Sequence, residues 1–396
     1  MRHVPRLLAD ELVRATRSFP AIILTGPRRA GKTTLLQRLF PEASYHLMED
    51  PDVLQRVRTD PRTFLDEVSA PAILDEIQNV PELFAYVRTR IDGHPRRTGQ
   101  WLLTGSQEAA LMHGVTESMA GRAAVLQLLP LSTLESDKVT PFRGGFPEVI
   151  ARPRSADVWL RSYVQTYLER DVRAVTAVRD LTTFRRFLAL VASRCGQLLN
   201  KTDLAAPLGV SAPTIGAWLD VLETTGQIMV VPPYFENFGK RLVKTPKLYF
   251  VDTGLLCSLL GIGSARELER SPFLGAVFES FVASEMAKAA LAAGRRRELY
   301  WYRDHQGLEV DFLLPAPGGG LMLVEAKATR TPTPDMARAM IRLRAALPAP
   351  PAAALLVHRT GRAAPDTETL APGIRAVGVA GLLERLWPRG RRPRRS

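Results

Sequence analysis

The chain has little cysteine and no long apolar run, and each absence excludes a class of protein. Cys195 and Cys257 are its 2 cysteines, too few for a disulfide framework, so the sequence favours a reducing compartment. No run approaches the roughly 18 apolar residues that a membrane helix requires. The first residues mix charges with apolar positions, unlike a signal peptide. We therefore expect a cytoplasmic protein with no membrane partner.

Acidic residues are in deficit, because 40 Asp and Glu stand against 53 Lys and Arg and give a formal net charge of +13. A basic surplus of this size favours a polyanionic partner, nucleic acid first. Part of the surplus lies in residues 389–396, which we expect to form a flexible tail, and part reflects an overall abundance of Arg, Ala and Pro. With 396 residues the chain exceeds one ordinary core, so two or three domains are expected.

A phosphate-binding loop is the strongest motif in the sequence. Gly26–Thr33 fits the pattern G-x-x-x-x-G-K-[ST], between a short apolar run at 21–24 and an amphipathic pattern from Thr34 onward. Such a loop wraps backbone N–H groups around phosphates, Lys32 reaches the β- and γ-phosphates, and Thr33 holds Mg²⁺. The predicted nucleotide-binding residues are Gly26, Pro27, Arg28, Arg29, Ala30, Gly31, Lys32, Thr33, Thr34 and Ser106.

Two further apolar runs end in polar residues suited to nucleotide hydrolysis. The run at 71–76 ends in Asp75, which we predict completes the Mg²⁺ site, and in Glu76, which we predict polarises the attacking water. The run at 101–106 ends in small polar residues, and either Thr104 or Ser106 could sense the γ-phosphate.

A helix-turn-helix with a β-wing is predicted for residues 181 to about 255. Ser211 is a good N-cap for a second helix, whose apolar face holds Ile215, Leu219 and Leu222, with Trp218 on another face. This helix carries no Arg or Lys, so base-specific DNA reading is disfavoured against backbone contact or a structural role. The positive charge falls instead on the wing, at Lys240, Arg241, Lys244 and Lys247.

A β-hairpin with charged residues is predicted near the C-terminal end. Its strands carry Asp311 and the pair Glu325 and Lys327, joined by a Pro/Gly turn, and an upstream helix adds Glu279. D-x₁₃-E-x-K is the pattern of the PD-(D/E)xK nucleases, in which carboxylates hold Mg²⁺ and a lysine positions a water. A buried ion pair in a fold that has lost catalysis remains the alternative.

Together these motifs make the chain resemble the bacterial and archaeal AAA+-like ATPases with a winged helix and a restriction-endonuclease-like C-terminal domain. The matching stretches are 24–34, 73–78, 103–107, 119–122, 144–148 and 249–255, with Glu279, Asp311 and 325–327.

The resemblance implies an α/β fold: a parallel-sheet P-loop core, a winged helix-turn-helix and an α/β nuclease-like domain. The implied boundaries are 1–136 for the ATPase, 137–180 for a helical connector, 181–257 for the winged helix, 258–388 for the nuclease-like domain and 389–396 for the tail. The resemblance also implies ATP over GTP, a homo-oligomer, and Arg122 as a finger acting on a neighbouring subunit.

Three functions are compatible with these residues. The first is an oligomeric ATPase that acts on DNA, with branched DNA such as a Holliday junction as a candidate substrate. The second is a nucleotide-gated regulatory or antitoxin-like interaction protein. The third is an ATP-regulated, Mg²⁺-dependent DNA nuclease.

Overall fold

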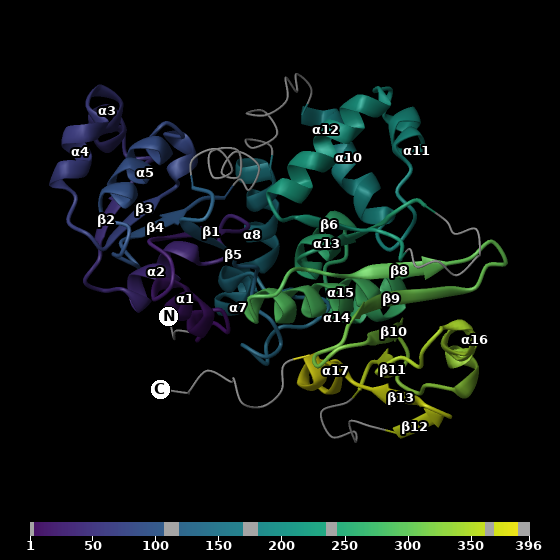
Figure 1. Cartoon of the computed structure of the whole chain (residues 1–396). Coiled ribbons are helices and arrows are strands. Elements are labelled where there is room, and N and C mark those ends of the chain that lie inside the picture. Colours follow the sequence, from purple (N-terminus) through teal and green to yellow (C-terminus); the bar gives the residue numbers. More distant parts are fainter. Residues whose placement is uncertain (1–3, 107–118, 169–180, 235–243, 361–367, 387–396) are drawn as a thin grey trace.

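The computed structural model describes residues 4–106, 119–168, 181–234, 244–360 and 368–386, and Figure 1 shows their arrangement. The predictions made for the basic tail, Lys240 and Arg241 lie outside the described residues.

The N-terminal part is a parallel β-sheet with helices on both faces, as predicted. Its strand order is β2-β3-β4-β1-β5, so β4 lies between the strand that precedes the phosphate loop and the strand that ends in Asp75. The strands are β1 (Ala21–Thr25), β2 (Ser44–Leu47), β3 (Ala72–Asp75), β4 (Trp101–Thr104) and β5 (Ala123–Gln127). The helices are α1 (Ala9–Thr16), α2 (Lys32–Leu39), α3 (Pro51–Thr59), α4 (Pro61–Glu67), the 3₁₀ turn η1 (Ile77–Asn79) and α5 (Leu83–Gly93).

The apolar runs read from the sequence become the buried strands of this sheet. Every residue of β1, β3 and β4 is buried, because helices cover both faces. Leu12 of α1 and Leu36 of α2 pack on one face, and Phe64 of α4 and Val87 of α5 pack on the other. The parallel arrangement brings the carboxyl ends of β1, β3 and β4 to one edge, where the polar residues that follow them meet.

Helices dominate the middle of the chain. They are α7 (Pro147–Ala151), η2 (Pro153–Ser155), α8 (Ala156–Tyr163), the π-helical η3 (Val164–Leu168), α10 (Leu181–Ser193), α11 (Lys201–Ala205), η4 (Ala206–Leu208), α12 (Ala212–Thr224), α13 (Thr253–Leu259) and α14 (Ala265–Arg270). The antiparallel strands β6 (Ile228–Val231) and β7 (Lys247–Phe250) follow α12, as predicted. Ser211 caps α12 by accepting a hydrogen bond from the Thr214 N–H.

The buried surface of α12 is wider than the sequence pattern predicted. Ile215, Leu219 and Leu222 are buried as predicted, but Trp218 is buried too, at 4% exposure. Its ring packs edge-on against Phe184 and Phe187 of α10. The helix therefore buries a wider face than the sequence pattern indicated, because α10 covers a second side of it.

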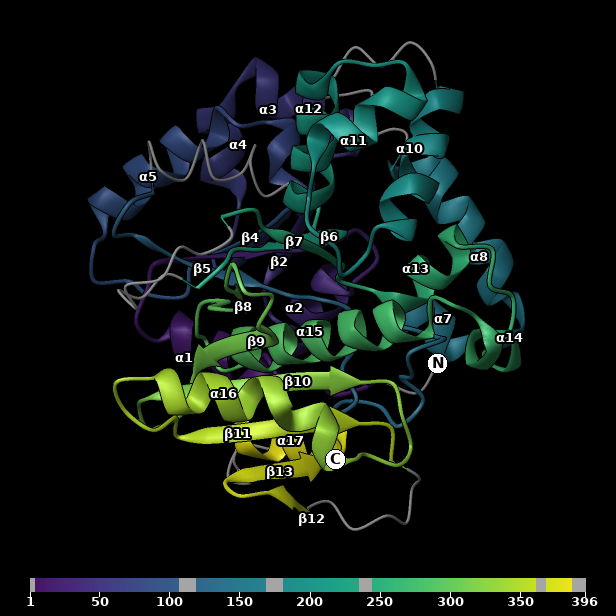
Figure 2. The same cartoon turned by 90° about the vertical axis from the view of Figure 1, so that its right-hand side faces the viewer.

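The C-terminal part is a mixed sheet of order β12-β13-β11-β10-β9-β8. Its elements are α15 (Leu274–Ala292), β8 (Tyr300–Arg303), β9 (Glu309–Pro315), β10 (Leu321–Lys327), η5 (Pro334–Ala337), α16 (Arg338–Ala346), β11 (Ala353–His358), β12 (Glu368–Ala371), β13 (Ile374–Val377) and α17 (Val379–Leu386). Figure 2 shows α16 in front of the sheet, and α15 and α17 pack on the opposite face. The predicted hairpin is present as β9 and β10.

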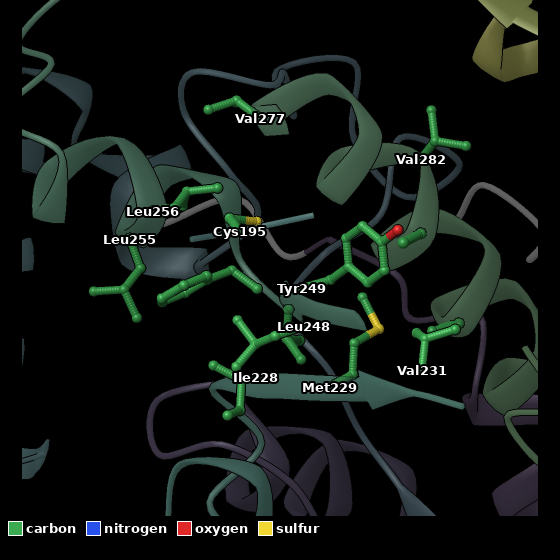
Figure 3. Packing of buried hydrophobic residues seen from close by; sticks show 14 of the residues in the cluster. Cys195, Ile228, Met229, Val231, Leu248, Tyr249, Leu255, Leu256, Val277 and Val282 are labelled. Carbon is green, nitrogen blue, oxygen red and sulfur yellow. The ribbon is translucent and has the colours of Figure 1, made fainter. Parts of the chain in front are cut away.

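A single apolar core joins the middle of the chain to the C-terminal sheet. Figure 3 shows α15 lying over the strands β6 and β7, and Val277 and Val282 of α15 belong to the same buried cluster as Leu248 of β7 and Met229 of β6. The same core continues to Phe312 of β9.

Within the described ranges, no single helix has the length and apolar content needed to cross a membrane. The α11–η4 segment and α12 pass such a test only as a pair, bent by 109°.

Candidate nucleotide-binding site

The phosphate loop connects β1 to α2 and has the backbone that a phosphate cradle requires. Gly26 has φ +133°, and a Cβ there would lie 2.1 Å from the Leu128 carbonyl oxygen, so the position demands glycine. Gly31 has φ +97° and stands at the N-cap of α2. In the described part of the chain, no side chain caps the first N–H groups of α2. These N–H groups and the helix dipole suit a phosphate.

Lys32 and Thr33 lie at the start of α2 with their side chains in different networks. Lys32 is 5% exposed, and its Nζ donates to the carbonyl oxygens of Gly26 at 2.9 Å and Pro27 at 3.0 Å. The Thr33 hydroxyl donates to Asp75 Oδ2 at 2.8 Å. The fold thus brings together the two residues predicted to hold Mg²⁺, one from α2 and one from β3.

Asp75 receives two more hydroxyl donors that the sequence did not single out for it. Tyr45 of β2 donates to its Oδ2 at 2.9 Å, and Thr104 of β4 donates to its Oδ1. Burial, followed by the negative charge of Asp75, raises the pKa of Tyr45, which keeps the phenol protonated as a donor. The sequence gives no signal for the role of Tyr45, because that role depends on the pairing of β2 with β3, which a sequence pattern does not reveal.

Glu76 has a backbone conformation unusual for its residue type. Its φ of +54° lies in the left-handed region, which costs energy for any residue other than glycine and which clusters at functional sites. Its Oε2 accepts hydrogen bonds from the Ser106 hydroxyl at 3.2 Å and from the Gln78 amide. Of the two residues that the sequence left as alternatives, Ser106 contacts the Glu76 carboxylate, whereas Thr104 contacts the Asp75 carboxylate and accepts from the Glu76 N–H at 3.4 Å.

Arg122 lies just before β5, at the end of the sheet where the parallel strands begin. The phosphate loop lies at the other end, where β1 stops. Its carbonyl oxygen accepts from the Ala21 N–H at the start of β1. Its guanidinium pairs with Asp92 in the last turn of α5, at 2.6 and 3.1 Å, and this pairing lowers the pKa of Asp92. Arg122 is therefore out of reach of the nucleotide site of its own subunit.

Arg6 is a buried residue beside the loop that sequence reasoning missed. Its guanidinium donates to the carbonyl oxygens of Ala30 at 2.8 Å and Leu129 at 2.5 Å, and its Nε pairs with Glu135 at 3.0 Å. Arg6 therefore holds the loop backbone at Ala30 against the backbone at Leu129. No motif marks this arginine, since it lies 24 residues before Ala30.

The carboxylates and lysine predicted on the C-terminal hairpin also meet. Lys327 Nζ lies 2.6 Å from Glu325 Oε1 and 4.0 Å from Asp311 Oδ2. Asp311 Oδ2 also accepts from the Ala326 N–H at 2.9 Å. Glu279 of α15 completes the group, which we call the hairpin cluster: Glu279, Asp311, Glu325 and Lys327.

The hairpin cluster holds a second lysine that had been assigned elsewhere. Lys247 was predicted to be one of the positive charges of the wing, and it does lie on β7, but it is 4% exposed and so adds no charge to the surface. Its Nζ lies 2.6 Å from Glu309 and 3.3 Å from Glu279, over the ring of Trp301. Strand alternation turns Lys247 inward, toward α15 and the sheet.

Burial perturbs the acids of the hairpin cluster. Burial, followed by the charge of Asp311, raises the pKa of Glu279 to about 7 and that of Glu325 to about 8. Burial alone would lower the pKa of Lys247, but Glu279, Asp311 and Glu309 raise it. In the described ranges, no group of three or more His, Cys, Asp or Glu side chains is arranged to hold a metal ion.

Comparisons with known proteins place the nucleotide site in a recognised domain. A family model described as an AAA domain matches residues 18–136. Two models described as domains of unknown function, DUF8612 and DUF4143, match residues 140–266 and 274–377. The parallel sheet, the phosphate loop and the carboxylates beside it thus define an N-terminal P-loop NTPase domain of the AAA type.

The chain belongs to the same family as the uncharacterized proteins Rv2008c of Mycobacterium tuberculosis and Mb2031c of Mycobacterium bovis. It is 34% identical to each over 342 residues, which covers 84% of this chain and 75% of each relative. Solved structures that are similar include the Walker-type ATPase PABY2304 of Pyrococcus abyssi, at 16% identity and a TM-score of 0.40, covering 64% of this chain and 94% of that one. The RuvB Holliday junction branch migration motor of Thermotoga maritima is similar at 16% identity and a TM-score of 0.33, covering 57% and 89%.

Proposed function

We propose that this protein is a Mg²⁺-dependent ATPase of the AAA+ type that works as a homo-oligomer and couples ATP hydrolysis to the remodelling of DNA or to movement along it. The observation that carries the ATPase proposal is the contact of Thr33 with Asp75, with Glu76 next in the chain. It puts a hydroxyl and a carboxylate at the helix N-terminus that suits phosphate.

Each residue of the site has a role in this proposal. The N–H groups of the loop and Lys32 bind the β- and γ-phosphates, and Thr33 and Asp75 hold Mg²⁺. When bound, the ion would supply positive charge that stabilises the phosphate group being transferred. Glu76 orients the attacking water, and Ser106, which donates to Glu76, holds that carboxylate in place. Arg122 acts on the site of a neighbouring subunit, once it leaves Asp92.

The DNA part of the proposal rests on charge and on the resemblance to winged-helix proteins. We propose the division 1–136, 137–180, 181–257 and 258–388 for the functional units. The second helix of the predicted helix-turn-helix, α12, has no Arg or Lys, so contact with the DNA backbone or a structural role is favoured over base reading. The burial of Lys247 removes one wing charge from such a contact. Branched DNA is the form to test first.

The experiment is ATP turnover of the wild type, Lys32→Ala and Glu76→Gln, with no DNA, duplex, single strand and a four-way junction. We expect Lys32→Ala to lose ATP binding, and Glu76→Gln to bind ATP without turnover. Hydrolysis retained in Lys32→Ala would remove the site assignment. Turnover that is indifferent to every DNA would favour the nucleotide-gated regulatory protein over the DNA motor.

A second candidate function is an ATP-regulated, Mg²⁺-dependent DNA nuclease. What favours it is that Asp311, Glu325 and Lys327 lie together in the hairpin cluster. Cleavage of DNA that disappears in both Asp311→Ala and Lys327→Ala would support this function. Cleavage that survives either substitution would come from another protein in the preparation.

A further inference from the structure

The phosphate loop touches a turn of the helical part of the chain directly. This turn, Thr225–Gln227, connects α12 to β6 and has Gly226 at φ +69°. A Cβ on Gly226 would lie 3.0 Å from both Cγ and Cδ of Pro27, so the ring of Pro27 packs against the turn. The loop thus contacts the chain just after the end of α12, almost 200 residues further along the sequence.

A buried hydrogen-bond chain makes a second connection between the same two segments. The Gln227 amide donates to the Tyr163 hydroxyl at 3.0 Å, and that hydroxyl donates to the carbonyl oxygen of Arg28 at 3.4 Å. Tyr163 is 1% exposed and Gln227 is 3% exposed. Both side chains are buried, so breaking these bonds costs free energy because water does not replace them. The Gln227 amide also donates to the Thr225 carbonyl oxygen at 3.0 Å, within the turn itself.

Two motifs that the nucleotide site does not use hold Tyr163 in place. Phe146, from the stretch 144–148, packs on the Tyr163 ring with centroids 4.9 Å apart. The preceding Gly145 N–H donates to the buried carboxylate of Asp252, from the stretch 249–255, at 2.7 Å. Gly145 is required, because a Cβ there would lie 2.0 Å from the Leu131 carbonyl oxygen.

The position of Lys32 makes the contact between the phosphate loop and the turn Thr225–Gln227 sensitive to the nucleotide. Its Nζ is bonded to the carbonyl oxygens of Gly26 and Pro27, so reaching a phosphate requires it to exchange these partners. That exchange alters the loop at Pro27, the residue that packs on Gly226. The nearby Gln227 N–H and carbonyl oxygen are bonded to Leu222 of α12 and to Val251, so a shift of the turn acts on both α12 and the strand pair.

We propose that Tyr163 and Gln227 are positioning residues for the phosphate loop and that, through them and Pro27, the turn Thr225–Gln227 reads the state of the nucleotide. This inference rests on the proposed ATP binding. It supplies the route by which occupancy of the AAA-type domain acts on α12 and the β6–β7 pair.

The test is hydrogen exchange at residues 225–231, with and without a non-hydrolysable ATP analogue and Mg²⁺, beside a direct binding measurement. We expect the analogue to change exchange at this turn in the wild type. Tyr163→Phe and Gln227→Leu should weaken analogue binding by about tenfold, as expected for lost buried hydrogen bonds. Even when either variant is saturated with the analogue, hydrogen exchange at residues 225–231 should no longer change. Tyr302→Phe, which removes a hydroxyl from another buried tyrosine, should keep both.

The outcomes separate this inference from the proposed function. A wild type that binds no analogue overturns the ATPase proposal, and this inference falls with it. Binding without a change at 225–231, or a response in Tyr163→Phe and Gln227→Leu equal to that of the wild type, overturns the inference and leaves ATP binding intact.

Discussion

The hydroxyl of Thr33 donates a hydrogen bond of 2.8 Å to the carboxylate of Asp75, across 42 residues of sequence. The bond joins the first turn of α2 to the carboxyl end of β3, and both residues are candidates for holding the same ion. Its consequence is that the Asp75 carboxylate is held from α2, β2 and β4 at once, since Tyr45 of β2 and Thr104 of β4 also donate to it.

Asp75→Asn should separate the binding of ATP from the use of Mg²⁺. The amide keeps a hydrogen-bond acceptor for Thr33 but loses the charge that attracts the ion. We expect turnover to fall by about a hundredfold or more, equivalent to about 2.7 kcal/mol. Binding of ATP in the presence of EDTA should stay within a few-fold of the wild type. Phosphate release measures turnover, and isothermal titration with and without Mg²⁺ measures binding. Equal Mg²⁺ dependence in the two proteins would contradict the role of Asp75.

Mixing two inactive variants tests whether Arg122 acts between subunits. Arg122→Ala should lower turnover by about a thousandfold, the lower end of the range for arginine fingers, with ATP binding unchanged. Lys32→Ala should be inactive because it binds no ATP. In a mixture, a Lys32→Ala subunit still offers Arg122 to its neighbour, so turnover above that of either variant is expected. A mixture no more active than its parts would argue against action in trans.

Replacing the buried Lys247 should destabilise the protein much more than replacing the exposed Lys244. Lys247→Met removes a cation from between Glu279 and Glu309, and breaking such a buried pairing costs about 3 kcal/mol. Lys244→Met, three residues earlier and exposed, should change stability by less than about 0.5 kcal/mol. Urea unfolding measures both. If the two variants are equally stable, the interior role of Lys247 is wrong.

Stability should depend on pH through the hairpin cluster. The folded-state pKa values of Glu279 and Glu325 are raised, to about 7 and about 8, above those of the unfolded chain. The folded protein therefore binds more protons than the unfolded chain at intermediate pH, so the free energy of unfolding falls as the pH rises from about 5 to about 8. Glu325→Gln, which cannot ionise, should flatten part of this slope in urea titrations. A slope equal to that of the wild type would place the titrating group elsewhere.

The sequence could predict the parts of the site that lie on continuous motifs. Gly26, Lys32, Asp75 and Glu76 follow short apolar runs, and hydrophobic runs bounded by glycine predict buried strands well. The same reasoning found the hairpin, because the alternation along 309–315 and 321–327 fixes which residues share a face.

What the sequence could not predict are contacts made across separate elements. Lys247 was taken for a wing charge because nothing in its local pattern reveals α15, which brings Glu279 to it. The burial of Trp218 was not predicted, because nothing in its local pattern reveals that α10 covers a second side of α12. Arg6, Tyr45 and Tyr163 lack any motif, since each acts on a loop or carboxylate distant in sequence.

The core shown in Figure 3 bears on how this chain could have arisen. The helix α15 and the strands β6 and β7 contribute buried side chains to one core, so a fragment holding only α15 or only the strands would present an apolar face to water. A gene break near residue 257 would therefore yield two aggregating fragments rather than two reusable modules. The same core also contains Leu129, Phe146 and Tyr163, so we expect expression of pieces cut anywhere within residues 129–386 to require a solubilising partner.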